Sequence, residues 1–266
     1  MIFASSVKER PLNRERQAFD LKPPELLRNV VIVLVNPTVA GNIGSAARAL
    51  KTMGLSRLVI VDGADYLNSA EGRKMAHRSW DTLESARQVA TFEEAVTNAH
   101  YVVGTTHRHR GKHLPKITSA REAVSEIVAR AANGPVALIF GTEDYGLTDE
   151  VLQKCNAVAA IPTALREPSL NLAQAVMLFC YEIFLASLDA PPAAQLEPAS
   201  TGEMEQLYAH MLGTLQAIGF RPHHGRPESF KRALRRVFGR APLEKQDVRL
   251  LHRIFQQIDY FVKRDA

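Results

Sequence analysis

The stretch Val30-Val31-Ile32-Val33-Leu34-Val35, followed by Asn36-Pro37, decides the fold of this chain. An uninterrupted run of mostly β-branched aliphatic residues is typical of a strand covered on both faces, as in a parallel sheet. Asn36-Pro37 ends that strand, and a glycine-containing loop leads into a helix predicted over 43–53. The small and apolar residues of this helix suit close packing on a sheet, and Gly54 ends it.

The same alternation of strand, loop and helix recurs along the chain as far as residue 188. A long helix over 170–188 should be well buried, because apolar residues occur almost all the way round it. Strands that alternate with helices predict an α/β fold with a parallel sheet. Further strands are predicted at 58–61, 101–104, 135–140 and 157–162, and further helices at 92–99, 120–132 and 150–155.

Composition divides the chain into four parts. The first residues mix basic and acidic side chains with prolines, which is typical of a weakly ordered arm. A segment rich in proline and small residues separates the α/β part from amphipathic helices predicted at 203–218, 228–238 and 245–262. The predicted parts are an N-terminal arm (1–28), an α/β domain (29–189), a linker (190–202) and a small all-α C-terminal extension (203–266).

The overall composition is that of an ordinary globular protein. Of the 266 residues, 46% are hydrophobic and 23% are charged, and no apolar run is long enough to span a bilayer. The first thirty residues lack a secretory apolar core, so the cytoplasm is the expected compartment. Cys155 and Cys180 lie in apolar segments outside any Cys/His cluster. We therefore expect buried free thiols and no metal site.

Basic residues gather in two segments of the sequence. The net charge of +5 permits nucleic-acid binding without demonstrating it. Residues 107–113 contain no acid, and residues 221–240 hold seven Lys or Arg against Glu228 alone. Either segment by itself is most simply a solvated basic face. Two such segments beside a candidate site favour contact with phosphates.

Three loops follow predicted strands at the edge of the sheet where ligands of α/β proteins bind. The loop over 36–48 carries Asn42 and Arg48, the loop over 140–147 carries Glu143, and the loop over 161–171 carries Ser169 and Asn171. Each loop alone has a simpler explanation. The first resembles ordinary turn chemistry, the second offers Asp144 and Asp149 as helix caps, and the third offers Ser169 as a cap.

Taken together, the three loops resemble the signature motifs of the SPOUT superfamily of methyltransferases, in its TrmH-like branch. Within that branch they are most similar to the bacterial TrmJ group of tRNA (cytidine/uridine-2′-O)-methyltransferases. The resemblance covers residues 29 to 262 and includes 234–238, which look like the Lys/Arg-rich helix of the family. The motifs that carry it are Asn42-Ile43-Gly44-Ser45-Ala46-Ala47-Arg48-Ala49 with 51–55, Phe140-Gly141 with Glu143 and 146–148, and Ser169-Leu170-Asn171-Leu172-Ala173.

The resemblance implies a fold, a cofactor and an assembly. The fold would be a SPOUT-type parallel sheet flanked by helices, with a C-terminal deep trefoil knot. The knot would hold S-adenosylmethionine, and the enzyme would act as a homodimer on tRNA without a metal. Carried over to this sequence, the cofactor contacts are Thr105, Thr106, His107, Gly141, Ile161, Ser169, Leu170 and Asn171.

The catalytic set implied by the resemblance is Asn42, Arg48, Glu143, Ser169 and Asn171. In the family, the arginine equivalent to Arg48 is assigned the role of activating the ribose 2′-hydroxyl. An arginine is a poor proton acceptor, so we expect it to stabilise the developing alkoxide and grip the adjacent phosphate. Glu143 and Asn42 would orient Arg48. The RNA-binding residues would be Arg232, Arg235 and Arg236.

One departure and several alternatives remain at this point. Relatives commonly carry Gly-Arg-Glu in the second motif, whereas this chain has Thr142 between Gly141 and Glu143, which places substrate contact there in question. The expected reaction is 2′-O-methylation of cytidine or uridine at position 32 of the tRNA anticodon loop. Alternatives are another tRNA position, ribosomal RNA, or a non-catalytic knotted RNA-binding protein. A nucleotide-binding dehydrogenase is poorly supported, because the first turn lacks Gly-x-Gly-x-x-Gly.

Overall fold

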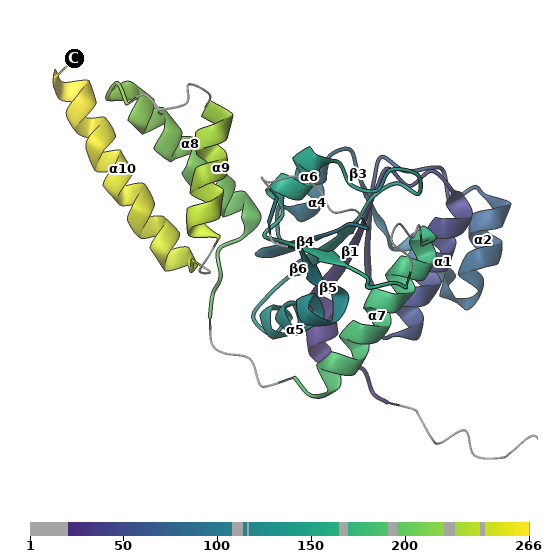
Figure 1. Ribbon diagram of the computed structural model, residues 1–266. Coiled ribbons are helices and arrows are strands. Elements are labelled where there is room, and N and C mark those ends of the chain that lie inside the picture. The colour runs from purple at the N-terminus through teal and green to yellow at the C-terminus, as the bar shows by residue number, and fades with distance from the viewer. Residues whose placement is uncertain are drawn as a thin grey trace, which may run out of the picture.

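The computed structural model describes residues 21–107, 114–115, 117–164, 170–190, 196–220, 227–239 and 243–265. These residues form an α/β unit and a separate group of three helices, joined by the segment that follows residue 188 (Figure 1). The predicted arm over 1–28 lies outside the described residues as far as residue 20. Its last residues contribute to the 3-10 helix Glu25–Asn29, whose Leu27 is fully buried, so the ordered unit begins earlier than predicted.

A parallel sheet forms the centre of the α/β unit. Seven strands are hydrogen-bonded in the order β3-β2-β1-β6-β4-β7-β5, and every pair is parallel. The carboxyl ends of all these strands therefore lie along one edge of the sheet. The strands are β1 (Val30–Val35), β2 (Arg57–Val61), β3 (Arg87–Val89), β4 (Tyr101–Thr105), β5 (Ile117–Ser119), β6 (Val136–Phe140) and β7 (Ala157–Ala160).

Helices cover both faces of the sheet. On one face, α1, α5 and α7 pack on alternate residues of β1 (Val30, Ile32 and Leu34), with α2 and α3 packed beside α1. On the other face, α4 and α6 pack on Val31, Val33 and Val35. The helices are α1 (Ala40–Thr52), α2 (Ala70–Ala76), α3 (Trp80–Glu84), α4 (Phe92–Val96), α5 (Ala120–Ala131), α6 (Asp149–Lys154) and α7 (Leu172–Leu188).

The burial of β1 on both faces confirms the prediction from its sequence. All six of its residues are buried, and the strand pairs with β2 on one side and β6 on the other. Both cysteines are buried free thiols, as predicted. Burial raises the pKa of the Cys155 thiol to about 12, which makes it unreactive at neutral pH.

The C-terminal helices α8 (Thr201–Ala217), α9 (Pro227–Phe238) and α10 (Lys245–Asp265) surround a small core of their own. Hydrogen bonds attach the start of α8 to the α/β unit. The Thr201 amide and hydroxyl both donate to the Ala99 carbonyl at 2.7 Å, and the Gly202 amide donates to the Thr97 carbonyl at 3.0 Å. The end of the predicted linker is thus held against the α/β unit by these hydrogen bonds.

Several predicted boundaries and caps differ from the structure. Asn171, and not Ser169, caps α7, which begins at Leu172. Thr148, and not Asp144 or Asp149, caps α6. Short elements at 70–76, 80–84, 87–89 and 117–119 were not predicted. No helix of the described residues has both the length and the apolar character needed to cross a membrane.

Candidate functional site

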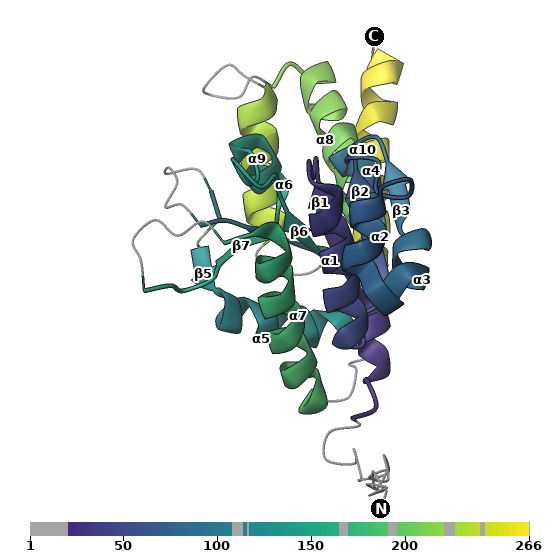
Figure 2. The same cartoon turned by 90° about the vertical axis from the view of Figure 1, so that its right-hand side faces the viewer.

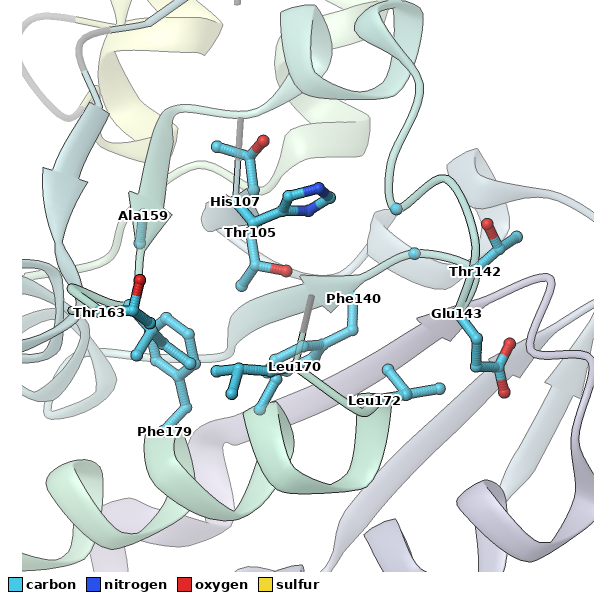
Figure 3. Close-up of a pocket in the computed structure, with 15 residues that line it drawn as sticks. Thr105, His107, Phe140, Thr142, Glu143, Ala159, Thr163, Leu170, Leu172 and Phe179 are labelled. Carbon is cyan, nitrogen blue, oxygen red and sulfur yellow. The ribbon is translucent and has the colours of Figure 1, made fainter. Parts of the chain in front are cut away.

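A pocket lies at the carboxyl edge of the sheet, where β4, β6 and β7 end beside the start of α7 (Figure 3). The empty space within it, including the part open to solvent, is about 730 Å³. The lining residues come from the ends of β4, β6 and β7, from the loops that follow these strands, and from α7. They are Thr105, Thr106, His107, Phe140, Gly141, Thr142, Glu143, Gly146, Ala159, Ile161, Thr163, Leu170, Leu172, Ala175 and Phe179.

The pocket has an apolar floor and a polar wall. Phe140 and Phe179 meet edge to face, with ring centroids 5.6 Å apart, and they extend the floor across β6 and α7. Thr105, the last residue of β4, and His107, just after it, supply polar atoms on the opposite wall (Figure 3). The Thr105 hydroxyl donates to the Ile139 carbonyl at 2.8 Å, which fixes its rotamer. The mixture suits a ligand with one apolar and one polar part.

Glu143 joins the loop after β6 to the N-terminus of α1. One carboxylate oxygen accepts from the amide and the hydroxyl of Thr38, at 3.0 and 2.9 Å. The other accepts from the Val39 amide at 3.2 Å and the Asn42 side-chain amide at 2.9 Å. Partial burial raises the pKa of Glu143, but the bonds from Asn42 and Thr38 outweigh it and hold the pKa below its ordinary value. The ionised carboxylate therefore acts as a structural anchor.

Asn42 connects this anchor to the third loop. While its amide nitrogen donates to Glu143, its oxygen accepts from the Asn171 side-chain amide at 2.9 Å. The Asn171 oxygen in turn accepts from the Ala173 amide at 2.9 Å and caps α7. The structure thus brings Glu143, Asn42 and Asn171 into one hydrogen-bonded chain that crosses all three predicted loops.

Arg48 is not part of that chain. Its side chain is exposed on α1, does not line the pocket, and makes no hydrogen bond or ion pair among the described residues. The expectation that Glu143 and Asn42 orient Arg48 is therefore wrong for this single chain. Those two residues bond to each other because the N-terminal turn of α1 offers unpaired donors close to Glu143.

The loop after β6 is a tight turn that only glycine allows at its start. A Cβ on Gly141 would lie 2.1 Å from the Gly146 carbonyl carbon and 2.2 Å from the Leu147 amide nitrogen. The glycine is therefore required by the loop itself. Thr142 helps close the turn, because its hydroxyl accepts from the Tyr145 amide at 3.2 Å.

The pocket contains most of the predicted cofactor contacts. Thr105, Thr106, His107, Gly141, Ile161 and Leu170 all line it. Asn171 lies beside it as the cap of α7, and Ser169 lies outside the described residues. The prediction missed Thr38, and it missed the face of α7 formed by Leu172, Ala175 and Phe179. The helical spacing of these three residues was a usable signal, although it indicates a buried core face equally well.

The predicted RNA-binding arginines have different surroundings. Arg235 forms a two-pronged ion pair with Glu205 of α8, at 2.8 and 2.9 Å. Arg232 donates to the Gln153 side chain of α6 at 3.1 Å. Arg236 is exposed. Two of the three thus stabilise contacts within the chain. Among the described residues, no group of three or more His, Cys, Asp or Glu side chains is arranged to hold a metal ion.

Comparisons with known proteins agree with this geometry. A sequence profile of the SpoU rRNA methylase family matches residues 29–181, and one of the C-terminal domain of the tRNA methyltransferase TrmJ matches residues 202–266. The chain is 40% identical to the tRNA (cytidine/uridine-2′-O-)-methyltransferase TrmJ of Escherichia coli O6:K15:H31, over 88% of this chain and 96% of that protein. The chain belongs to the SpoU methylase family, in its TrmJ branch.

Solved structures of this family share the fold. The crystal structure of TrmJ from Zymomonas mobilis superposes with a TM-score of 0.72 at 29% identity, covering 86% of this chain and 98% of that one. A methylase family protein from Neisseria gonorrhoeae gives 0.63 at 36% identity, over 72% of this chain and 99% of that one. The seven-stranded parallel sheet and its flanking helices are therefore those of SpoU methylases.

Proposed function

We propose that this chain transfers a methyl group from S-adenosylmethionine to the 2′-oxygen of a ribose in tRNA, at cytidine or uridine 32 of the anticodon loop. The observation that carries the proposal is the hydrogen-bonded chain Glu143–Asn42–Asn171, which unites the three family motifs beside one pocket. The profile match over 202–266 favours tRNA over ribosomal RNA, because that domain is described for a tRNA methyltransferase.

The residues of the pocket fit a nucleoside-like cofactor. Ile161, Leu170 and Phe179 offer an apolar floor for a flat base, and Thr105 and Thr106 offer polar groups for a ribose. The cofactor, when bound, supplies an electrophilic methyl group. Placing the 2′-oxygen in line with that group requires a rigid wall, and fixed geometry of this kind lowers a barrier by several kcal/mol. We also infer the trefoil knot of the family.

The catalytic side chains divide into positioning and charge-stabilising roles. Glu143 has donors on both oxygens, so it holds α1 in place and has no free geometry for accepting the 2′-hydroxyl proton. Asn42 and Asn171 fix the relative position of α1 and α7. The unpaired guanidinium of Arg48 then stabilises the developing 2′-alkoxide and grips the neighbouring phosphate.

A homodimer in the cytoplasm completes the proposal. The outer face of α7 exposes Leu178, Tyr181, Leu185 and Leu188, which are between 39% and 46% accessible and form one helical stripe. Since α1 packs beside α7, a second copy docked on this stripe would approach Arg48. Light scattering of the wild type should give twice the mass of one chain. The double variant Leu178→Glu/Leu185→Glu should give the mass of a single chain. A monomeric wild type would contradict the dimer.

Mapping 2′-O-methylation in tRNA from cells with and without the gene tests the substrate. We expect the modification at position 32 to disappear from the deletion strain and to return with the wild-type chain. Loss at another tRNA position would move the target, and loss confined to ribosomal RNA would favour the rRNA alternative. Unchanged methylation of both RNAs would favour the non-catalytic alternative.

A further inference from the structure

Helix α10 carries a stripe of exposed cations with an aromatic residue among them. Arg249, Arg253 and Arg264 are exposed, and the Tyr260 side chain is 59% accessible. Arg253, Tyr260 and Arg264 follow Arg249 by four, eleven and fifteen residues. At 3.6 residues per turn, these spacings place all four side chains on one side of the helix, over about 22 Å of its length. These four residues are called the α10 stripe below.

No acidic side chain that the structure describes balances the α10 stripe. The two aspartates of α10 with described side chains are engaged elsewhere. Asp247 accepts from the Glu244 amide at 2.9 Å, and Asp259 accepts from the Thr214 hydroxyl at 2.6 Å and lies 3.0 Å from His210 of α8. Within the described part of the chain, the three arginines of the stripe make no hydrogen bond or ion pair.

The basic residues of α9 differ in this respect. Glu205 of α8 pairs with Lys231 at 2.7 Å and with Arg235 at 2.8 Å. Partial burial raises the pKa of Glu205, but bonds from Arg235 and Lys231 outweigh it and lower the pKa. Glu205 is thus ionised at neutral pH and compensates charge on α9. Of the two basic helices, α10 keeps more charge available to an external anion.

The orientation of the α10 stripe is fixed by the opposite face of the helix. Val248, Leu251 and Phe255 pack into the core shared with α8 and α9. His210 and His252 stack with ring centroids 5.0 Å apart, and their Nδ1 atoms are 2.8 Å apart. Helix α10 is the outermost of the three, on the side away from the sheet (Figures 1 and 2). Its stripe therefore faces solvent at a distance from the pocket.

We propose that the α10 stripe binds the sugar-phosphate backbone of the RNA substrate. Guanidinium groups match phosphate oxygens in a two-pronged geometry, and unpaired cations gain most when condensed counterions leave the RNA. Tyr260 stacks on a base or ribose between two phosphate contacts. This inference rests on the proposed function for the identity of the RNA, and it assigns binding to a helix other than the one that sequence similarity indicated.

Separation of the stripe from the pocket has a kinetic consequence. Residues that hold a remote part of the substrate lower KM, whereas the chemistry at the pocket sets kcat. Loss of the stripe should therefore raise KM for tRNA and leave kcat at saturating tRNA almost unchanged. Loss of Arg48 should lower kcat and leave KM for tRNA almost unchanged.

Fluorescence anisotropy with labelled tRNA and the full-length protein tests the inference. The test variant carries Arg249→Gln, Arg253→Gln and Arg264→Gln. The matched control carries Lys22→Gln, Arg28→Gln and Arg57→Gln, which remove the same charge from exposed positions near the amino ends of the strands. We expect Kd at 0.15 M salt to rise about tenfold or more in the test variant only. The slope of log Kd against log salt should fall by about 2 to 3, since each phosphate contact contributes about 0.9.

Four results would overturn the inference. An unchanged Kd and salt slope in the test variant would remove the stripe from the RNA interface. An equal loss in the control would show a general effect of net charge. Loss only with Arg232→Gln and Arg236→Gln would assign the contact to α9. Polyglutamate or anionic phosphatidylserine vesicles binding the stripe in place of tRNA would likewise contradict it.

Failure of the proposed function would look different. A wild type that binds tRNA through the stripe but transfers no methyl group would leave this inference standing and remove the enzyme assignment. A wild type that methylates tRNA with the same KM as the test variant would leave the enzyme assignment standing and remove the stripe.

Discussion

The side-chain amide of Asn171 donates to the side-chain oxygen of Asn42 at 2.9 Å, across 129 residues of sequence. This bond joins the N-terminal cap of α7 to the first turn of α1. Asn42 is bound at the same time by Glu143, so the orientation of its amide is fixed by partners on both sides. An asparagine is needed here because it donates with one atom and accepts with the other.

Replacement of Asn42 should therefore cost activity more than cofactor affinity. Asn42→Asp places a second carboxylate beside Glu143 and removes the donor, so like charges repel across the anchor. We expect kcat to fall at least about tenfold, with cofactor affinity by calorimetry changed little. Ser45→Ala on the same helix is the matched control and should keep wild-type kcat. Wild-type kcat in Asn42→Asp would show that the chain of bonds is not needed for turnover.

Glu143→Gln should destabilise the loop after β6. Each carboxylate oxygen accepts two donors, and an amide retains only one acceptor oxygen. Most of these donors are exposed and can bond to water, so the loss should be about 1 kcal/mol, which urea denaturation measures as a lower free energy of unfolding. The neighbouring exposed residue provides the control Asp144→Asn, for which we expect no change. Equal stability of both variants would mean that Glu143 anchors nothing.

Gly141→Ala should distort the loop that forms one side of the pocket. The new Cβ would lie within 2.4 Å of three backbone atoms of Gly146 and Leu147, at positions that no side-chain movement relieves. The turn over 141–147 must then open, and we expect cofactor affinity to fall at least about tenfold. Gly213→Ala, where a Cβ meets nothing, is the control. Normal cofactor binding in Gly141→Ala would separate the turn from the cofactor site.

His100 should make the stability of the α/β unit depend on pH. Burial, together with the charge of nearby Arg130, lowers the pKa of His100 to about 4 from an ordinary 6.5. The unfolded chain therefore binds more protons between pH 6.5 and 4, and the free energy of unfolding decreases as the pH falls through that window. His100 is partly exposed, so the contribution is about 2 kcal/mol or less.

Urea denaturation at pH 7 and pH 5 measures this effect. The wild type should lose stability at the lower pH, and His100→Gln should lose less. His77→Gln, an exposed histidine, should behave like the wild type. The same pH dependence in His100→Gln and wild type would assign the effect to other groups.

The sequence predicts the long buried elements well and the short ones poorly. The strand Val30–Val35 has the predicted bounds, because a run of aliphatic residues buried on both faces ends at Asn36-Pro37. Helix α2 has only seven residues, and its position depends on close packing against α1. A Cβ atom at Gly44 of α1 would lie 2.2 Å from the Gly72 carbonyl oxygen of α2, so the two helices can approach this closely only because residue 44 is a glycine. Such a helix is stabilised by tertiary contacts that no local pattern records.

The candidate site was predictable in its members but not in its connections. Family motifs supplied Asn42, Glu143 and Asn171, and the structure adds that they bond to one another and not to Arg48. Thr38 was missed because its role depends on Glu143, which lies 105 residues further along the chain. The ion pair of Arg235 with Glu205 was missed for the same reason, since pairing between helices is set by their packing.

Methyl transfer from labelled S-adenosylmethionine to tRNA, compared between the wild type and Arg48→Ala, tests the central claim most directly. We predict incorporation into ribose 2′-oxygens with the wild type, and a loss of at least about a hundredfold in kcat with Arg48→Ala, whose cofactor affinity by calorimetry stays near that of the wild type. No incorporation by the wild type into any tRNA, or full turnover by Arg48→Ala, would contradict the account.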